Sequence, residues 1–130
     1  MNPKIWGRHA WIFLHSVALN YPKEPTEHDK ARYRSFFTDL RDILPCGMCQ
    51  SHYTENLKKI PIENALESRS TLSRWLVEVH NSVNQSTGKP LITYPQFIKK
   101  YEAMYSMESK FNKIVAGIIL SAVVLWYFRK

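Results

Sequence analysis

Cys46 and Cys49 carry the clearest chemistry in this chain, because they form a CxxC pair with only Gly47 and Met48 between them. Two sulfurs at this spacing at the start of a helix face the same way, so they can close a disulfide and open it again. The free N–H groups and the dipole at a helix start stabilise a thiolate. The pair is therefore suited to thiol–disulfide exchange.

Half of a zinc site and a purely structural disulfide are the other interpretations of such a pair. Zinc requires two further ligands, but the sequence has no second CxxC and its five histidines are spread from position 9 to position 80. A disulfide across two intervening residues closes too small a loop to stabilise much. We expect no metal. A membrane adaptor and a protein that only exchanges disulfides remain alternatives.

The elements that position the pair are predicted to be helices. Apolar residues recur at spacings of three and four in five segments, and no segment alternates as a strand would. A thioredoxin-like exchanger needs strands before its CxxC, so the pattern argues against that fold. The pattern predicts an all-α protein, a four-helix bundle plus a short fifth helix, with helices over residues 5–20, 27–43, 46–59, 70–85 and 94–108.

Length and charge limit the classes of function. The chain has 130 residues, 45% of them hydrophobic, which fits one compact domain with a real core. The net charge of +7 comes partly from three cations near the end, Lys113, Arg129 and Lys130. The other lysines are scattered, so we expect no nucleic acid partner. Residues 11–14 are too short for the apolar region of a signal peptide, so the domain is expected to stay where it is made.

Three motifs resemble the signatures of the Erv/ALR family of FAD-linked sulfhydryl oxidases. They are GRHAWIFLHSVA from Gly7 with a closing Tyr21-Pro22, PCGMC from Pro45 with a following His52-Tyr53, and HNSVN from His80 with a following Gly88-Lys89-Pro90. They occur in the order of the family and at fitting separations. The resemblance implies a four-helix bundle that holds FAD between its helices, in agreement with the predicted elements.

The resemblance also implies a reaction. FAD oxidises the dithiol, the reduced flavin passes its electrons to O2 and gives H2O2, and the disulfide is handed to a client thiol. Cys49 would be the sulfur near the flavin and Cys46 the sulfur that exchanges with the client. The family usually forms homodimers.

The motif positions supply suitable groups for FAD. Trp11 and His15 lie four apart on one helix, as do His80 and Asn84 on another, so the two pairs can line a groove. Rings can stack on an adenine, cations can face a pyrophosphate, and amides can bind the flavin or ribose edge. The predicted cofactor-binding residues are Gly7, Arg8, Trp11, His15, His52, Tyr53, His80, Asn81, Val83, Asn84 and Lys89.

The end of the chain predicts a membrane anchor. Residues 114–128 carry no charge. As a helix they would span about 22 Å, against about 30 Å for a hydrocarbon core, and flanking cations and interfacial aromatic residues can make up the difference. The alternative is a buried core helix. We expect an oxidase domain over residues 1–108, a polar linker over residues 109–113 and the anchor over residues 114–128.

The chain differs from many relatives in having no second, distal CxxC. It should therefore receive electrons directly from a partner, a thioredoxin- or glutaredoxin-like dithiol protein. Small forms with a single CxxC occur in large DNA viruses that assemble in the cytoplasm, and the opening MNPK followed by WGR resembles them. This predicts a viral protein of the host cytoplasm, held at a membrane or in a virion with its domain on the cytosolic side.

Overall fold

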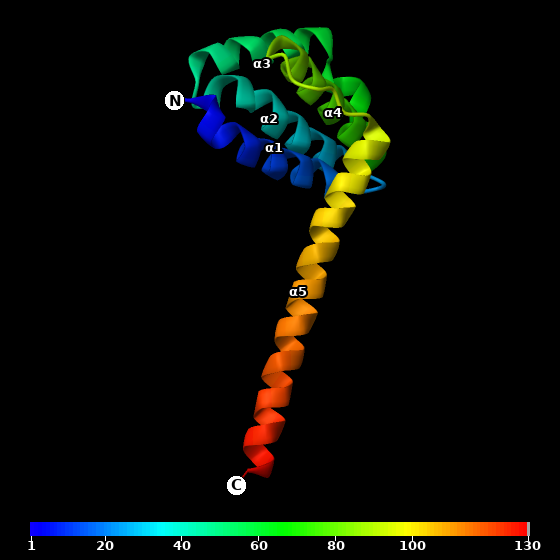
Figure 1. Cartoon of the computed structure of the whole chain (residues 1–130). Helices are drawn as coiled ribbons and strands as arrows, with labels where there is room; N and C mark the ends of the chain where they lie inside the picture. The colour runs from blue at the N-terminus through cyan, green and yellow to red at the C-terminus, as the bar shows by residue number, and fades with distance from the viewer. Residues whose placement is uncertain (130) are drawn as a thin grey trace. The chain divides into compact units, whose positions relative to one another are not determined.

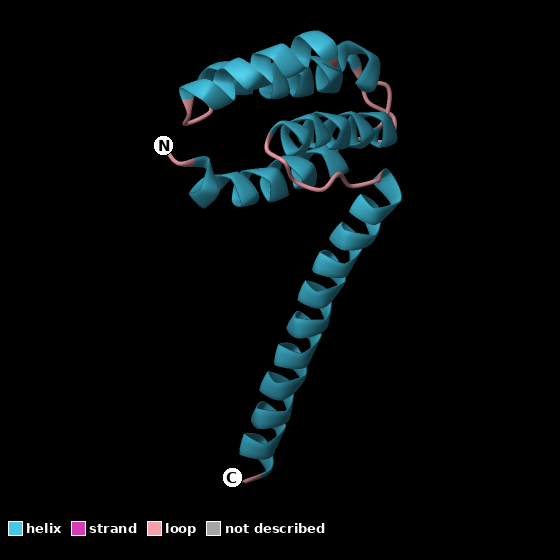
Figure 2. Ribbon diagram, turned by 45° about the horizontal axis from the view of Figure 1, so that its top comes forward, coloured by secondary structure: helices cyan, strands magenta, loops and turns pink. Residues whose placement is uncertain are grey.

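The computed structural model describes residues 1–129, apart from the side chains at positions 108, 109 and 122. Within that range it is helical and contains no strand (Figure 2). The elements are α1 (Pro3–Leu19), α2 (Glu27–Ile43), α3 (Gly47–Lys59), the short 3-10 helix η1 (Ile62–Ala65), α4 (Arg69–Ser86) and α5 (Tyr94–Phe128). The all-α prediction is confirmed, and the predicted helix boundaries are correct to within two residues except for the end of the fifth helix.

Helices α1 to α4 form a four-helix bundle (Figure 1). Helix α1 packs on α4, α4 on α3 and α3 on α2, and Phe13 of α1 meets Phe36 of α2 edge to face at 6.3 Å between ring centroids. The helix periodicity places one apolar face of each helix inside. The shared core includes Leu14, Ala18, Phe37, Leu40, Leu72, Trp75, Leu76 and Val79.

Side-chain caps define where the helices begin. Thr26 and Asp29 form a reciprocal capping box at the start of α2, and this hydrogen bonding to Thr26 lowers the pKa of the Asp29 carboxyl. Thr93 and Gln96 do the same at the start of α5. Each box satisfies backbone N–H groups that have no partner within the helix.

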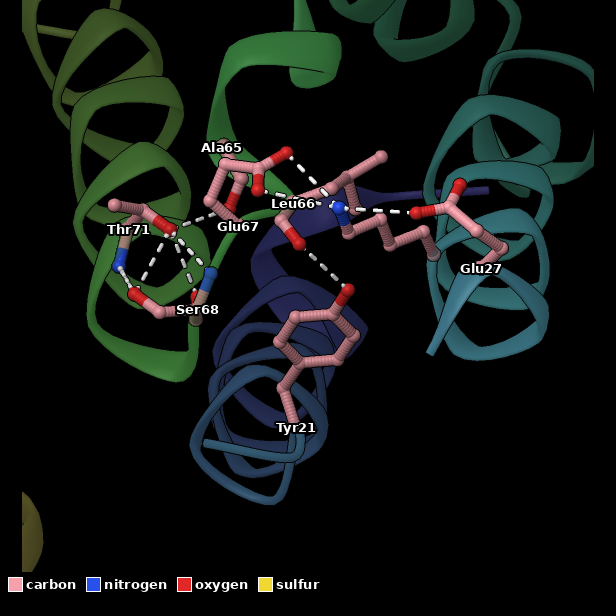
Figure 3. A network of polar contacts seen from close by, with 8 residues as sticks. Tyr21, Glu27, Ala65, Leu66, Glu67, Ser68 and Thr71 are labelled. Carbon is pink, nitrogen blue, oxygen red and sulfur yellow. Dashed lines mark hydrogen bonds and ion pairs between the residues drawn. The ribbon is translucent and has the colours of Figure 1, made fainter. Parts of the chain in front are cut away.

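Tyr21, fully buried after α1, links that helix to the segment between η1 and α4. Its hydroxyl donates to the carbonyl of Leu66 at 2.9 Å, and burial raises the pKa of this phenol, so it remains a donor. Lys30 of α2 bridges Glu27 and Glu67 beside it. Figure 3 shows Tyr21 pointing at Leu66, next to the carboxylates of Glu27 and Glu67. The sequence did not predict η1, which begins directly after Pro61.

The chain divides into two units, Met1–Ile92 and Thr93–Lys130. In the second unit a single helix runs from Tyr94 to Phe128, so the segment 109–113 is helical and not a break between two helices. No Pro or Gly occurs between residues 96 and 116 to end the helix. By length and composition its apolar stretch could cross a membrane, and none of the described part of that stretch is buried. The membrane anchor and the buried core helix both stay predictions for residues 114–128.

Candidate functional site

The CxxC pair lies at the N-terminus of α3 as a closed disulfide, with 5.1 Å between the two Cα atoms. Cys46 is the N-cap residue, and its sulfur accepts a hydrogen bond from the backbone N–H of Cys49 at 3.2 Å. Both cysteines are half-buried. Sulfurs joined to each other are not thiolate ligands, and the described residues contain no cluster of three His, Cys, Asp or Glu side chains that could hold a metal ion. A disulfide at this position can be opened and closed by thiol–disulfide exchange.

The inner face of α3 continues from Cys49 through Tyr53 to Asn56, at spacings of four and three residues. Tyr53 is buried in the core and donates its hydroxyl to the carbonyl of Phe37 on α2 at 2.9 Å. Burial raises the pKa of this phenol, so it stays protonated. Asn56 accepts a hydrogen bond from Ser82 of α4 at 2.7 Å. These bonds set the position of the dithiol helix against α2 and α4.

The disulfide lies at the end of the bundle where α1 begins. Figures 1 and 2 both place the turn between α2 and α3 beside the N-terminus of the chain. The first turns of α1, with Gly7 and Arg8, are therefore on the same end of the bundle as the redox pair.

A cluster of three rings joins α1 to α4. Trp11 and His80 stack face to face, with 3.9 Å between centroids and 6° between ring planes. His15 is buried and its Nε2 lies 3.0 Å from Nδ1 of His80. One of these nitrogens must donate and the other accept. The predicted grouping of Trp11, His15 and His80 is present, and it offers flat ring faces and imidazole nitrogens at the seam between the two helices.

The other predicted residues differ in their surroundings. Arg8, His52 and Lys89 are exposed, whereas Gly7 and Val83 are half-buried. Asn84 is buried, and its backbone carbonyl accepts the N–H of Lys89 at 2.8 Å. The side chain of Asn81 is bonded to the backbone of Ile92.

Sequence reasoning did not single out Trp6, Asn56 or Ser82. The indole Nε1 of Trp6 is buried and has no hydrogen-bond partner among the described residues, so it could donate to a bound molecule. Asn56 could have been found from its position seven residues after Cys49, where a polar side chain interrupts the inner face of α3. Nothing in the sequence distinguishes Ser82 from other helical serines.

Comparison with known proteins identifies the family. The model of the Erv1 / Alr family matches residues 8–102, most of the chain. The chain belongs to this family. The match includes the disulfide, the ring cluster and the segment that follows α4.

Individual relatives agree with this assignment. The "Probable FAD-linked sulfhydryl oxidase" of Acanthamoeba polyphaga mimivirus is 44% identical over 111 residues, which are 85% of this chain and 78% of the relative. The mitochondrial FAD-linked sulfhydryl oxidase ERV1 of Saccharomyces cerevisiae is 40% identical over 86 residues, which are 65% of this chain but only 43% of the yeast protein. The chain thus spans less than half of that Erv1/Alr relative.

A solved structure supports the same fold. The crystal structure of the yeast Erv1 core superposes with a TM-score of 0.65 and 34% identity, covering 71% of this chain and 76% of that one. The likeness between this chain and the Erv1/Alr proteins therefore extends from the sequence to the arrangement of helices.

Proposed function

We propose that this chain is an FAD-dependent sulfhydryl oxidase that forms disulfides in partner proteins and passes the electrons to O2, giving H2O2. The observation that carries the proposal is the Cys46–Cys49 disulfide at the N-terminus of α3 in an Erv1/Alr bundle. Both relatives quoted above are named FAD-linked sulfhydryl oxidases, and these names support the proposal.

The residues present fit FAD. The stacked rings of Trp11 and His80 suit an aromatic base, and the buried indole N–H of Trp6 would donate to a bound acceptor. Arg8 and Lys89 are exposed cations that can face a pyrophosphate. Asn84, Val83, Gly7, His52 and Tyr53 complete the proposed set. When bound, FAD would supply a two-electron acceptor for the dithiol and transfer those electrons to O2.

The dithiol exchanges with its client in two balanced steps. A client thiolate attacks the sulfur of Cys46, a mixed disulfide forms, and Cys49 leaves as a thiolate. The second client thiolate then attacks the client sulfur of the mixed disulfide and displaces Cys46. The client loses two electrons and its two thiol protons, and the Cys46–Cys49 pair gains the two electrons.

The geometry favours Cys49 as the sulfur near the cofactor. Cys49 lies on the inner face of α3 above Tyr53 and Asn56, both of which are buried. Cys46 precedes the helix as its N-cap, where the helix dipole and nearby N–H groups stabilise a thiolate leaving group. Cys46 is thus the sulfur that meets the client.

The client, the oligomeric state and the location of the chain complete the proposal. The proposed client is a dithiol protein of the thioredoxin or glutaredoxin class that reaches Cys46 directly. Two copies associate through the bundle. The exposed apolar stretch 114–128 anchors the chain in a membrane, and the similarity to a mimivirus protein supports a viral protein of the host cytoplasm with its domain on the cytosolic side.

The full chain, purified in detergent, tests the proposal. We expect a yellow protein with flavin absorbance bands that consumes O2 when given a dithiol such as dithiothreitol. A colourless protein that exchanges thiols without consuming O2 would instead support a disulfide exchanger that needs no flavin.

A further inference from the structure

Asn81 of α4 holds the backbone of Ile92 at two points. Its Nδ2 donates to the carbonyl of Ile92 at 2.8 Å, and the N–H of Ile92 donates to its Oδ1 at 3.0 Å. The two residues are eleven apart in sequence. A side-chain amide that pairs with both groups of one residue fixes the position and the direction of that backbone.

The segment Lys89–Ile92, here called the strap, is thereby pinned at both ends. Gly88 takes a positive φ of 67° just after α4, a conformation that glycine adopts without strain and that turns the chain back. The N–H of Lys89 then donates to the carbonyl of Asn84 at 2.8 Å. Asn84 holds the first residue of the strap and Asn81, one turn earlier on α4, holds the last.

We propose that Asn81 is a positioning residue for the cofactor site, which acts by holding the strap against α4 and so placing Lys89, and not by contacting the cofactor. The inference rests on the proposed function, because Lys89 is a proposed contact of the FAD pyrophosphate. It differs from the role predicted for Asn81 from its side-chain chemistry, a hydrogen bond to the flavin or ribose edge.

The hydrogen bonds explain why the placement of Lys89 depends on Asn81. Pro90 has no N–H to donate, and Lys89 is exposed, so packing does little to fix it. Without Asn81, the hydrogen bonds among the described residues would hold the strap to α4 at Lys89 only. A bound anion would then have to order the strap as it binds, and the affinity would fall.

A thermodynamic cycle on the full chain in detergent tests this role. The variants are Asn81→Ala, Lys89→Ala, the double variant, and Asn64→Ala as a matched control on the exposed face of η1. The affinity for FAD is measured by flavin fluorescence after removal of the cofactor. We expect Asn81→Ala to weaken FAD binding roughly tenfold, and the double variant to bind no more weakly than Lys89→Ala. Additive losses would mean that Asn81 contacts FAD directly and would overturn the proposal.

Amide hydrogen exchange of the flavin-free protein provides the second readout. Asn81→Ala should speed exchange at the Ile92 amide, whereas Asn64→Ala should leave it unchanged. Unchanged exchange in Asn81→Ala would show that the clamp is not formed and would overturn the proposal. If the wild-type chain binds no FAD, the proposed function fails and with it the role of Asn81 toward Lys89, while the exchange data still report whether the clamp exists.

Discussion

The two cysteines have different surroundings, although they are only three residues apart. Cys46 is the N-cap of α3 and its sulfur accepts the Cys49 N–H, whereas Cys49 begins the inner face that continues to Tyr53 and Asn56. Because hydrogen bonds to a thiolate lower its basicity, Cys46 should leave readily from its mixed disulfide with the client in the second step of the proposed exchange. These different surroundings support the proposal that Cys46 meets the client and Cys49 the cofactor.

Replacing each cysteine separately should separate these roles. Cys49→Ser should abolish O2 consumption with a dithiol while FAD stays bound, because the sulfur that reduces the flavin is gone. Cys46→Ser should also abolish turnover but leave Cys49 next to the flavin. The flavin absorbance spectrum of this variant should therefore differ from that of Cys49→Ser. Ser51→Ala, an exposed change on the same helix, should keep turnover. Equal flavin spectra in the two cysteine variants would contradict the assignment.

His80 belongs to the proposed cofactor site, and its contacts should also stabilise the fold. His80→Ala removes the face-to-face stack on Trp11 and the hydrogen bond to buried His15, and should destabilise the fold by about 2 kcal/mol. The denaturant midpoint and the flavin content of the purified protein should both fall. His28→Ala, on an exposed part of α2, is the control. A normal flavin content in His80→Ala would argue against the cofactor site at the ring cluster.

At the scale of elements, a few polar bonds fix how the helices pack. The bond of Ser82 to Asn56 joins α4 to α3, that of Tyr53 to Phe37 joins α3 to α2, and that of Tyr21 to Leu66 joins the end of α1 to the start of α4. Each lies in or beside the core, where an unpaired carbonyl is costly. Apolar contacts alone would allow neighbouring helices to slide past one another, and these hydrogen bonds restrict that movement.

Tyr21→Phe tests one of these bonds. The variant keeps the buried ring but leaves the carbonyl of Leu66 without its donor, which should lower the free energy of unfolding by about 1–2 kcal/mol. Glu67→Gln removes an ion-pair partner of Lys30 nearby, but Glu67 is 70% exposed, so its effect should be much smaller. Chemical denaturation of the full chain compares them. A larger loss in Glu67→Gln would mean that the surface network dominates.

Helix positions and the redox pair could be predicted from the sequence because they depend on local information. Apolar periodicity locates α1 to α4, and two cysteines at a helix start define a dithiol on their own. The contacts of Asn81, Asn56 and Tyr21 could not be predicted, since each pairs with a residue at least eleven positions away. The predicted end of the fifth helix at residue 108 was wrong, since the helix continues to Phe128 and polarity alone does not end a helix.

At the scale of the whole molecule, the apolar end of α5 requires an apolar environment. From Ile114 to Phe128 large apolar side chains are exposed on every side of the helix, which is stable in hydrocarbon but not in water. A bilayer satisfies this surface, and Trp126 and Tyr127 suit its interface. The anchor proposal therefore depends on the exposure of the helix as much as on its composition.

Charges placed in the apolar stretch should release the chain from membranes. Leu120→Arg and Val123→Arg together should oppose insertion by about 2.5–3.5 kcal/mol each, so the full chain should wash from vesicles in alkaline carbonate. Phe111→Arg, the same change just before the stretch, should stay bound. If wild type and both variants wash off equally, residues 114–128 are an interface with another protein instead.

Because α5 is continuous, the segment between Thr93 and Lys113 has a fixed length and a fixed helical rotation along its axis. That stretch is about 30 Å long, and each residue added or removed changes its length by about 1.5 Å and turns everything beyond it by about 100°. A deletion of seven residues keeps nearly the same rotational phase while shortening the segment by about 10 Å, whereas a deletion of five turns the face that α5 presents by about 140°. The length of this segment and the direction in which the rest of α5 faces can thus be varied separately, by the number of residues that are deleted.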